Sequence, residues 1–315
     1  MVKNTKLNIR AKLFSYFTTM YIPKLKQSNF PKMVRSLSAF LFIFFLLSIV
    51  FTNSAKAQYY YKDIWNNQQL IKEFSILKSD NLRTIKIKSF EDDGEPSDGF
   101  FCEKKINKGF SQSQMISKSN ITGQSLLVSD YNADGRPVKS TDDTPTTISS
   151  TNYEYDQSGK LKLIRTTTKA DDDSGQIVET HEYFYDEKGL PSKMLRKKND
   201  VLITTVNFLN DAAGNTIEED VDSDSRTEKK YYYYYDSKNR LTDVVHYNYS
   251  AKRLLPSYMY EYNAQGQPKQ MISTEEGGSN YFIWKYSYND KNLRETEKCL
   301  SKERRLLGTI QYEYN

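Results

Sequence analysis

Histidine and cysteine, two of each, are scarce in this chain of 315 residues, and the spacing of its candidate catalytic side chains matches no common catalytic motif. The two histidines, His181 and His246, each lie beside an aromatic-rich predicted strand, so we expect them to face solvent. The chain has no glycine-rich phosphate loop, no Cys/His metal spacing and no Gly-x-Ser-x-Gly elbow. Two carboxylates could form a glycosidase pair in the folded protein, but the sequence singles out no two acids for that role. We therefore predict a protein that is not an enzyme, without catalytic residues or a cofactor.

One segment, residues 130–135 (Asp-Tyr-Asn-Ala-Asp-Gly), matches the first six positions of a calcium-binding loop, with oxygens at alternate residues before a turn glycine. The twelfth position, where such loops have Glu, is Thr141. Residues 220–224 give a weaker match. Because a repeated turn already accounts for the polar residues of the first segment, we predict a solvated loop and no metal site.

The two cysteines, Cys102 and Cys299, lie far apart in the sequence. In an oxidising compartment they could form a disulfide, and the alternative is two isolated thiols. A count of two does not decide between these alternatives.

The dominant feature of the chain is a short phrase that returns seven times. An aromatic pair spaced by two is followed by Asp or Asn, two further residues, and Gly or Asn. A fixed period of this kind indicates a repeat architecture. The clear copies are Tyr153-Glu-Tyr155-Asp156-Gln-Ser-Gly159, Tyr183-Phe-Tyr185-Asp186-Glu-Lys-Gly189, Tyr233-Tyr-Tyr235-Asp236-Ser-Lys-Asn239, Tyr260-Glu-Tyr262-Asn263-Ala-Gln-Gly266 and Tyr286-Ser-Tyr288-Asn289-Asp-Lys-Asn292; the weaker ones contain Asn132 and Gly135, and Asp211 and Gly214; an eighth begins at Tyr312.

Each copy has the chemistry of a β-hairpin corner. Asp or Asn at the first position can bond its own backbone two residues on, and Gly or Asn at the fourth enters the left-handed region at low cost. This predicts a type I turn closed by a left-handed residue. The predicted turn residues are Asn132, Gly135, Asp156, Gly159, Asp186, Gly189, Asp211, Gly214, Asp236, Asn239, Asn263, Gly266, Asn289 and Asn292.

The paired tyrosines should share one face of the sheet, because side chains alternate along a strand. We expect them to form an aromatic ladder that stabilises the fold, and a Tyr-rich ligand face is the alternative. The candidate ligand-face residues are Tyr153, Tyr155, Tyr183, Tyr185, Tyr233, Tyr235, Tyr260, Tyr262, Tyr286 and Tyr288. The corners recur about every 25 residues, enough for two strands, a tight turn and a looser loop. One end of the sheet should carry the short turns and the other the acidic loops.

Residues 235–242 (Tyr-Asp-Ser-Lys-Asn-Arg-Leu-Thr) and 155–161 (Tyr-Asp-Gln-Ser-Gly-Lys-Leu) resemble the YD repeat of the Rhs family, whose pattern is Tyr-Asp-x-x-Gly-Arg-Leu-Thr. The resemblance covers about residues 128–315. It implies antiparallel sheets that spiral into shells around a toxin, or cell-surface and carbohydrate-associated proteins. About seven repeats are too few to enclose a toxin, and the last one is followed by no enzymatic domain, so the enclosing role is not carried over. The resemblance implies an exported bacterial repeat protein of a Bacteroidetes-like kind.

The N-terminal residues 1–57 have the features of an export leader. They contain nine Lys or Arg and no acid, which leaves 36 basic and 40 acidic residues in the rest, so a nucleic-acid partner is not expected. An apolar run of 13 residues, Ala39–Phe51, precedes Ala55 and Ala57. This predicts a signal peptide cleaved after Ala57, with translation starting at Met33. A retained membrane anchor is the alternative, although the run is short for one.

These patterns predict an all-β protein: an antiparallel meander of repeated hairpins in an extended or spiral sheet, with a short N-terminal helix. The helix is expected where Ile64, Trp65, Ile71, Phe74 and Leu77 recur at helical intervals. Three regions follow. Residues 1–57 are the leader, residues 58–123 contain the helix and first strands that cap the open sheet edge, and residues 124–315 contain the repeats.

The expected function is a non-enzymatic scaffold or binding protein that is secreted, periplasmic or on the cell surface. The alternative is a carrier or binder of a lipid or glycan on a Tyr-rich concave face. The expected partner is a protein or glycan of the cell envelope, with no nucleic acid and no stable membrane span after cleavage of the leader.

Overall fold

The computed structural model describes residues 59–171, 175–223, 229–248, 251–274 and 280–315. The predicted leader lies outside these residues, as do parts of the acidic loops. The described part contains one helix, α3 (Tyr61–Ser79), at the predicted place. The strands that follow are β1 (Thr84–Phe90), β2 (Phe101–Ile106), β3 (Gln112–Ser119), β4 (Gly123–Tyr131), β5 (Pro137–Asp143), β6 (Thr147–Tyr155), β7 (Leu161–Ala170), β8 (Gln176–Tyr185), β9 (Pro191–Lys198), β10 (Val201–Asn210), β11 (Thr216–Ser223), β12 (Lys229–Tyr235), β13 (Leu241–Asn248), β14 (Arg253–Tyr262), β15 (Pro268–Thr274), β16 (Tyr281–Tyr288), β17 (Arg294–Leu300) and β18 (Leu306–Tyr314).

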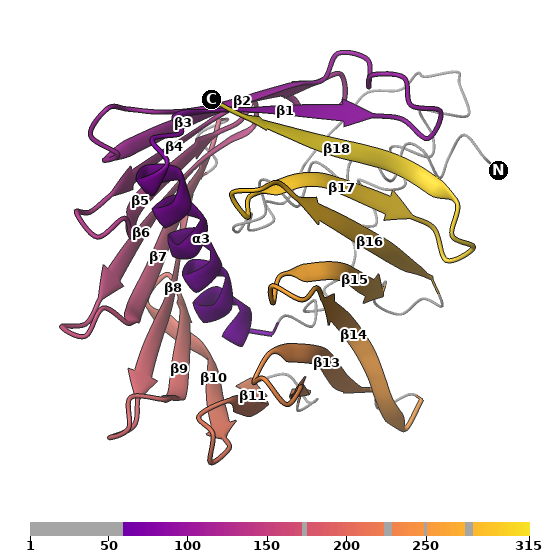
Figure 1. The fold of residues 1–315 in the computed structure, drawn as a ribbon. Helices are drawn as coiled ribbons and strands as arrows, with labels where there is room; N and C mark the ends of the chain where they lie inside the picture. Colours follow the sequence, from indigo (N-terminus) through magenta and orange to yellow (C-terminus); the bar gives the residue numbers. More distant parts are fainter. Residues whose placement is uncertain (1–58, 172–174, 224–228, 249–250, 275–279) are drawn as a thin grey trace, which may run out of the picture.

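The 18 strands form one antiparallel sheet that closes on itself as a barrel (Figure 1). Consecutive strands are neighbours throughout, and β1 pairs with both β2 and β18. The prediction of an extended or spiral sheet is therefore wrong. The closing seam runs from Ile85 opposite Tyr314 to Phe90 opposite Thr309.

Closure follows from the physics of the sheet. Each strand is twisted relative to its neighbour, so a long meander curls, and pairing the first strand with the last removes two exposed edges. The expected cap over an open edge is also wrong, because neither β1 nor β18 has an unpaired side.

The helix α3 lies inside the barrel, against the inner side of β4 to β8 (Figure 1). Its buried residues are Ile64, Asn67, Phe74 and Leu77. The Phe74 ring stacks on Tyr131 of β4 with centroids 3.9 Å apart. No helix in the described residues is long and apolar enough to cross a membrane.

The two faces of the wall differ in chemistry. In β6, Ser149, Thr151 and Tyr153 are buried on the inner face, while Asn152 and Glu154 are exposed on the outer face. The same alternation places aromatic and aliphatic side chains on the inner wall near the short turns. The core is therefore the inner wall together with the helix that it surrounds.

Candidate functional site

The seven predicted corners share one geometry. In each, the backbone N–H of the fourth residue donates to the carbonyl of the first, as from Gly159 to Asp156 at 2.9 Å. The first side chain accepts the N–H of the residue four positions on, as from Lys160 to Asp156 Oδ1 at 2.9 Å. The fourth residue has φ between 56° and 87° in every copy. The pairing register shifts just before each corner, as between Glu154 and Tyr155, which marks a β-bulge in each hairpin next to the turn.

The second tyrosine of each pair bonds the neighbouring hairpin. Regular pairing between hairpins stops short of the turns; β5 and β6, for example, pair no further than Lys139 opposite Asn152. Beyond that point a phenolic hydroxyl donates to the first carbonyl of the preceding return strand. The bonds run from Tyr155 to Pro137, Tyr185 to Leu161, Tyr235 to Thr216, Tyr262 to Leu241, Tyr288 to Pro268 and Tyr314 to Arg294, at 2.6 to 2.9 Å. In the copy without this tyrosine, the Asn210 amide donates to Pro191 instead.

A second contact links adjacent corners along the same rim. The residue just after each corner reaches the fourth residue of the next one, so that Arg136 lies over Gly159 and Lys160 over Gly189. Where the next corner ends in Asn, the contact is a hydrogen bond, as from Asn215 Nδ2 to Asn239 Oδ1 at 3.1 Å. The turn rim is thus a continuous chain of side-chain contacts.

The tyrosines predicted as a possible ligand face all lie on the inner wall. The first of each pair is the more enclosed: Tyr153, Tyr183, Tyr233 and Tyr260 are buried. The second of each pair uses its hydroxyl for the bond between hairpins. The described geometry therefore assigns the pairs to packing and bonding within the wall, and a ligand role stays a prediction.

A buried polar cluster surrounds His181, which is 2% exposed, so the expectation that this histidine faces solvent is wrong. Its Nδ1 lies 2.7 Å from Asp63 Oδ2 of α3, and its Nε2 lies 3.3 Å from Glu179. Arg196 donates to Glu179 at 2.5 Å, and Tyr183 donates to Asp63 at 2.8 Å. The cluster joins the helix to β8 and β9.

The groups of this cluster stabilise one another in their charged forms. Burial opposes the charged form of His181, but hydrogen bonds to Asp63 and Glu179 raise its pKa. Burial likewise opposes ionisation of Glu179, but His181 and Arg196 lower its pKa to about 2. Hydrogen bonding and charge from His181 lower the pKa of Asp63 despite its burial. The cluster is therefore held as ion pairs.

A second buried acid, Glu219 of β11, is fully buried against the start of α3. Its carboxylate accepts the backbone N–H groups of Tyr60 and Tyr61 at 2.8 and 2.9 Å, and the Tyr233 hydroxyl at 2.7 Å. The first N–H groups of a helix lack partners within it, and no side chain of the helix itself caps this end. Glu219 thus supplies the helix cap from the barrel wall, and burial raises its pKa to about 7.

The remaining candidate groups do not converge on a site. His246 is half-buried, and its Nδ1 lies 2.8 Å from Ser257. Cys102 and Cys299 are not bonded to each other; they lie on β2 and β17, three pairing steps or roughly 14 Å apart, too far for a disulfide. The described residues contain no group of three or more potential metal ligands.

The calcium-like segment serves the turn instead. Asn132 Oδ1 accepts the N–H groups of Asp134 and Arg136, the Asp134 carboxylate pairs with Arg136, and Asp130 accepts from Gln112. The side-chain oxygens of this segment therefore bond Asp134, Arg136 and Gln112 and do not point toward one common centre.

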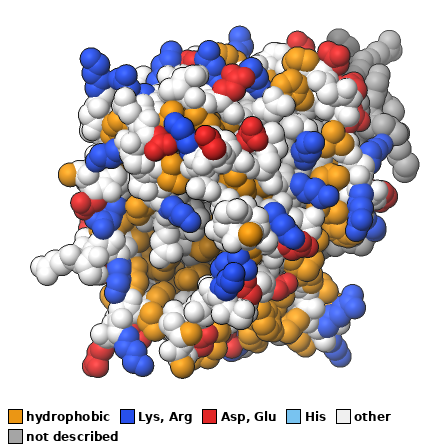
Figure 2. Space-filling model, in the orientation of Figure 1, with side chains coloured by type: hydrophobic (Ala, Val, Ile, Leu, Met, Phe, Trp, Pro, Cys, Tyr) orange, Lys and Arg blue, Asp and Glu red, His pale blue; other side chains and the backbone are white. Residues whose placement is uncertain are grey.

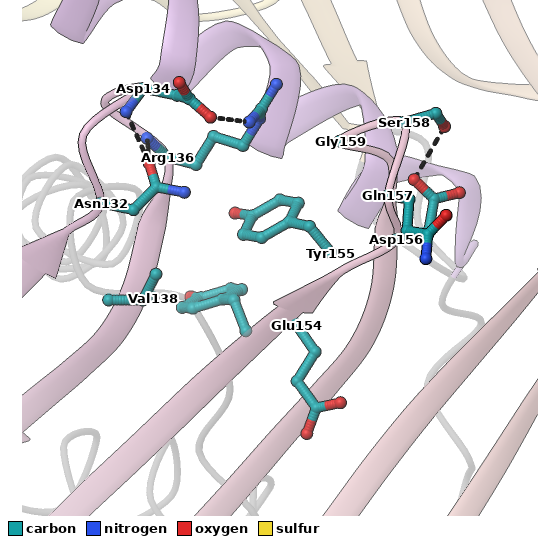
Figure 3. Close-up of a pocket in the computed structure, with 11 residues that line it drawn as sticks. Asn132, Asp134, Arg136, Val138, Glu154, Tyr155, Asp156, Gln157, Ser158 and Gly159 are labelled. Atoms are coloured by element: carbon teal, nitrogen blue, oxygen red, sulfur yellow. Dashed lines mark hydrogen bonds and ion pairs between the residues drawn. The ribbon is translucent and has the colours of Figure 1, made fainter.

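An open polar pocket of about 670 Å³ lies at the turn rim, between the first two corners (Figure 3). Arg136 lies over the Tyr155 ring, 5.8 Å from its centroid. Ser158 donates to Asp156 at 2.8 Å. The pocket forms where β5 and β6 stop pairing, so the bond between hairpins and the pocket share Tyr155. Its lining residues are Asn132, Asp134, Arg136, Val138, Tyr153, Glu154, Tyr155, Asp156, Gln157, Ser158 and Gly159.

A belt of hydroxyl pairs on the inner wall was not anticipated from the sequence. Ser117 lies 2.6 Å from Ser125, and Ser149 lies 2.9 Å from Thr168. Further pairs join Ser129 to Ser140 and Thr151 to Thr166 at 3.1 and 3.0 Å. The signal in the sequence was Ser or Thr at positions 147, 149 and 151 of β6, together with Ser at positions 113 and 117 of β3 and at positions 125 and 129 of β4. These side chains give part of the inner face a polar character.

No family model and no curated protein matches the chain. Solved structures give distant likenesses. A porin-like protein from Bacteroides uniformis ATCC 8492 is 10% identical, with a TM-score of 0.38 over 74% of this chain and 98% of that one. A porin-like protein from Bacteroides vulgatus ATCC 8482 is 11% identical, with a TM-score of 0.26 over 74% and 98%. The TcdB2-TccC3-TEV structure is 10% identical, with a TM-score of 0.28 over 66% of this chain and 16% of that one. Likenesses this distant leave the function to be argued from this chain's own residues.

Proposed function

We propose that the chain is an exported, non-enzymatic β-barrel protein of the cell envelope that acts as a rigid scaffold or binding surface. The observation that carries the proposal is that the concave face of the sheet is occupied by the chain's own helix. Four buried groups, Asp63, Glu179, His181 and Glu219, form the contacts that hold that helix. A fifth, Glu297 of β17, accepts hydrogen bonds from Arg294 and Tyr312 of the wall. A catalytic group needs access to a substrate, which these groups lack.

The chemistry of the outer wall supports a barrel that stands in water. Charged side chains pair between neighbouring strands along it: Lys197 with Glu182 at 3.2 Å, and Lys230 with Glu218 and Asp220 at 3.1 Å each. A lipid-facing wall would carry a continuous apolar band, whereas Figure 2 shows charged side chains spread over the visible face, with exposed apolar side chains among them. We therefore infer a position in the periplasm, at the cell surface or outside the cell, with no membrane span after cleavage of the leader.

Fractionation of the source cell with mass spectrometry of the mature N-terminus tests this proposal. We expect the protein in a periplasmic, surface or secreted fraction and released by salt washes without detergent, with Gln58 as its first residue. Incubation with envelope glycans and peptides should leave these substrates intact. Recovery only in detergent, or robust turnover of a substrate by the pure protein, would contradict the proposal.

A second candidate function is glycan binding at the turn rim, and the pocket there favours it over lipid binding. Asn132, Gln157 and Arg136 offer hydrogen-bond donors around Tyr155, while Asp134, Glu154 and Asp156 offer acceptors. A ligand whose hydroxyls both donate and accept suits this mixture. In Figure 3 Asn132 and Arg136 lie near the Tyr155 ring, while the Glu154 side chain points away from it.

Titration with cellotetraose, chitotetraose and mannotetraose, followed by saturation-transfer NMR, tests glycan binding. The double variant Glu154→Ala, Gln157→Ala removes two exposed lining side chains and should weaken binding at least tenfold. The matched variant Glu261→Ala, Gln265→Ala alters exposed positions around another corner and should bind as the unaltered protein does. Equal binding by both variants would place the glycan elsewhere.

A further inference from the structure

The two halves of α3 are held in the barrel by different chemistry. The second half packs through apolar groups: Phe74 stacks on Tyr131, and Leu77 is fully buried. From there the chain runs directly into β1, and Lys291 of a corner lies 3.5 Å from Asp80 at the helix end. None of the apolar contacts depends on a proton.

The first half also packs through Ile64 and through ring contacts of Tyr61 and Trp65, but its polar anchors are groups that titrate. Glu219 accepts the first N–H groups of the helix, and Asp63 pairs with His181. The structure surrounds these groups with further charges and phenols from each packed element. They are Tyr59 and Tyr60 just before α3, Lys62 and Asp63 of α3, Glu179 and Tyr183 of β8, Arg196 of β9, and Tyr231 and Tyr233 of β12.

We propose that the first turns of α3 form a pH-dependent latch, docked on the barrel wall in mildly acidic surroundings and loosened in alkaline surroundings, while the second half of the helix stays in place. This inference does not depend on the scaffold function proposed above. It assigns a conformational role to a buried network that the scaffold function uses only as an anchor.

The latch loosens at higher pH because the docked helix binds protons more tightly than the undocked helix does. Burial raises the pKa of docked Glu219 to about 7, against 4.5 for an exposed Glu. The docked helix therefore favours the protonated acid, and docking weakens as the pH rises from 4.5 through 7. The pKa of docked His181 is raised too, so its loss of a proton above that value also weakens docking. When Glu219 and His181 have both lost their protons, three negative carboxylates, Asp63, Glu179 and Glu219, surround the start of the helix. The positive charges of Arg196 and Lys62 then oppose them.

Amide hydrogen exchange of the whole exported protein, read by mass spectrometry, tests the latch. Exchange rates are corrected for the intrinsic effect of pH. From pH 5 to pH 8.5 we expect the opening equilibrium of residues 60–67 to rise by about ten- to a hundredfold. Residues 74–79 and the strands β4 to β8 should keep their protection over the same range.

Substitution of the acid identifies the titrating group. Glu219→Gln keeps an oxygen acceptor for the helix N–H groups but cannot ionise, so the pH effect should shrink at least severalfold. Asp220→Asn alters the neighbouring residue on the outer wall and should retain the full effect. Tyr233→Phe removes the phenol that donates to the same carboxylate and leaves Glu219 itself in place. It should change the pH at the midpoint of the effect. This variant serves as the test if Glu219→Gln does not fold.

Two results would overturn the latch. One is protection of residues 60–67 that does not change with pH in the unaltered protein. The other is loss of protection in α3 and the strands together, which would show that the whole barrel opens as one unit. An unchanged pH effect in Glu219→Gln, and an unchanged midpoint in Tyr233→Phe, would also exclude Glu219 as its source.

Discussion

At the scale of single residues, the tyrosine hydroxyl at each rim position replaces a backbone hydrogen bond. The strands of adjacent hairpins diverge before the corner, so the first carbonyl of each return strand lacks a backbone donor from the next hairpin. A phenol reaches across the gap, and three of these return strands begin with Pro137, Pro191 or Pro268. Proline suits this place, because no partner strand requires its missing N–H. The recurrence of tyrosine therefore has a structural cause that is independent of any ligand.

Tyr235→Phe should lower the free energy of unfolding by about 1–2 kcal/mol, because the Thr216 carbonyl loses its donor while the ring still packs. Tyr234→Phe changes the same chemical group on an adjacent side chain that is 49% exposed, and should have an effect near zero. Urea denaturation of both variants measures the difference. Equal stability of the two would show that the hydroxyl bond contributes nothing net.

The glycines at the corners differ in what surrounds them. Gly135 and Gly266 have φ values of 77° and 80°, so alanine at either is strained, by about 1–2 kcal/mol. At Gly135 the added Cβ would also lie 3.1 Å from Phe74 of the helix, while at Gly266 the nearest atom, of Arg240, is 3.9 Å away. Gly135→Ala should therefore be less stable than Gly266→Ala by about a further 1 kcal/mol. Denaturation midpoints that coincide would show that Phe74 moves aside at no cost.

At the scale of elements, α3 acts as the internal core of the barrel. A barrel of 18 strands encloses more space than its own wall side chains usually fill, and the helix supplies apolar groups at one end and ion pairs at the other. Tyr61 contacts the Tyr233 ring with centroids 5.2 Å apart, and Trp65 contacts Tyr260 at 6.0 Å. The helix therefore contacts β12 and β14 as well as β4 and β8, and it links these parts of the inner wall.

The ion pairs at the helix start make overall stability depend on pH. The pKa values of Asp63 and Glu179 are lower in the folded protein than in the unfolded chain. The protein therefore loses stability below about pH 4, as these acids take up protons. Above 4.5 Glu219 costs stability progressively up to its pKa of about 7, and His181 adds to the loss as it gives up its proton above its usual pKa. We expect thermal unfolding to show maximal stability between about pH 4.5 and 6.5. A maximum above pH 8 would contradict these assignments.

At the scale of the whole molecule, the sequence predicted the hairpins but not their closure. Corner chemistry is local, so Asp156 and Gly159 suffice to predict a turn. Closure depends on the twist and stagger accumulated over 18 strands, and no single residue carries that information. The burial of His181 could not be predicted for the same reason: it depends on which part of the inner wall the helix covers. The helix itself was predictable from its apolar spacing, and Glu219, its cap, lies 159 positions from Tyr60.

A disulfide across the closing seam would test the closed barrel directly. Lys86 on β1 lies opposite Glu313 on β18, and opposite residues of antiparallel strands have Cα atoms about 4.5–5.5 Å apart, within reach of a disulfide. Lys86→Cys with Glu313→Cys should therefore form an intramolecular bridge and stabilise the protein by about 2–4 kcal/mol. Lys86→Cys with Gln311→Cys places the second thiol one diagonal step away and should bridge poorly. Cys102 and Cys299 can remain, because both are buried and peptide mass spectrometry distinguishes their bridges from the new one. An open or spiral sheet would keep β1 and β18 apart, and the first pair would then link only between molecules.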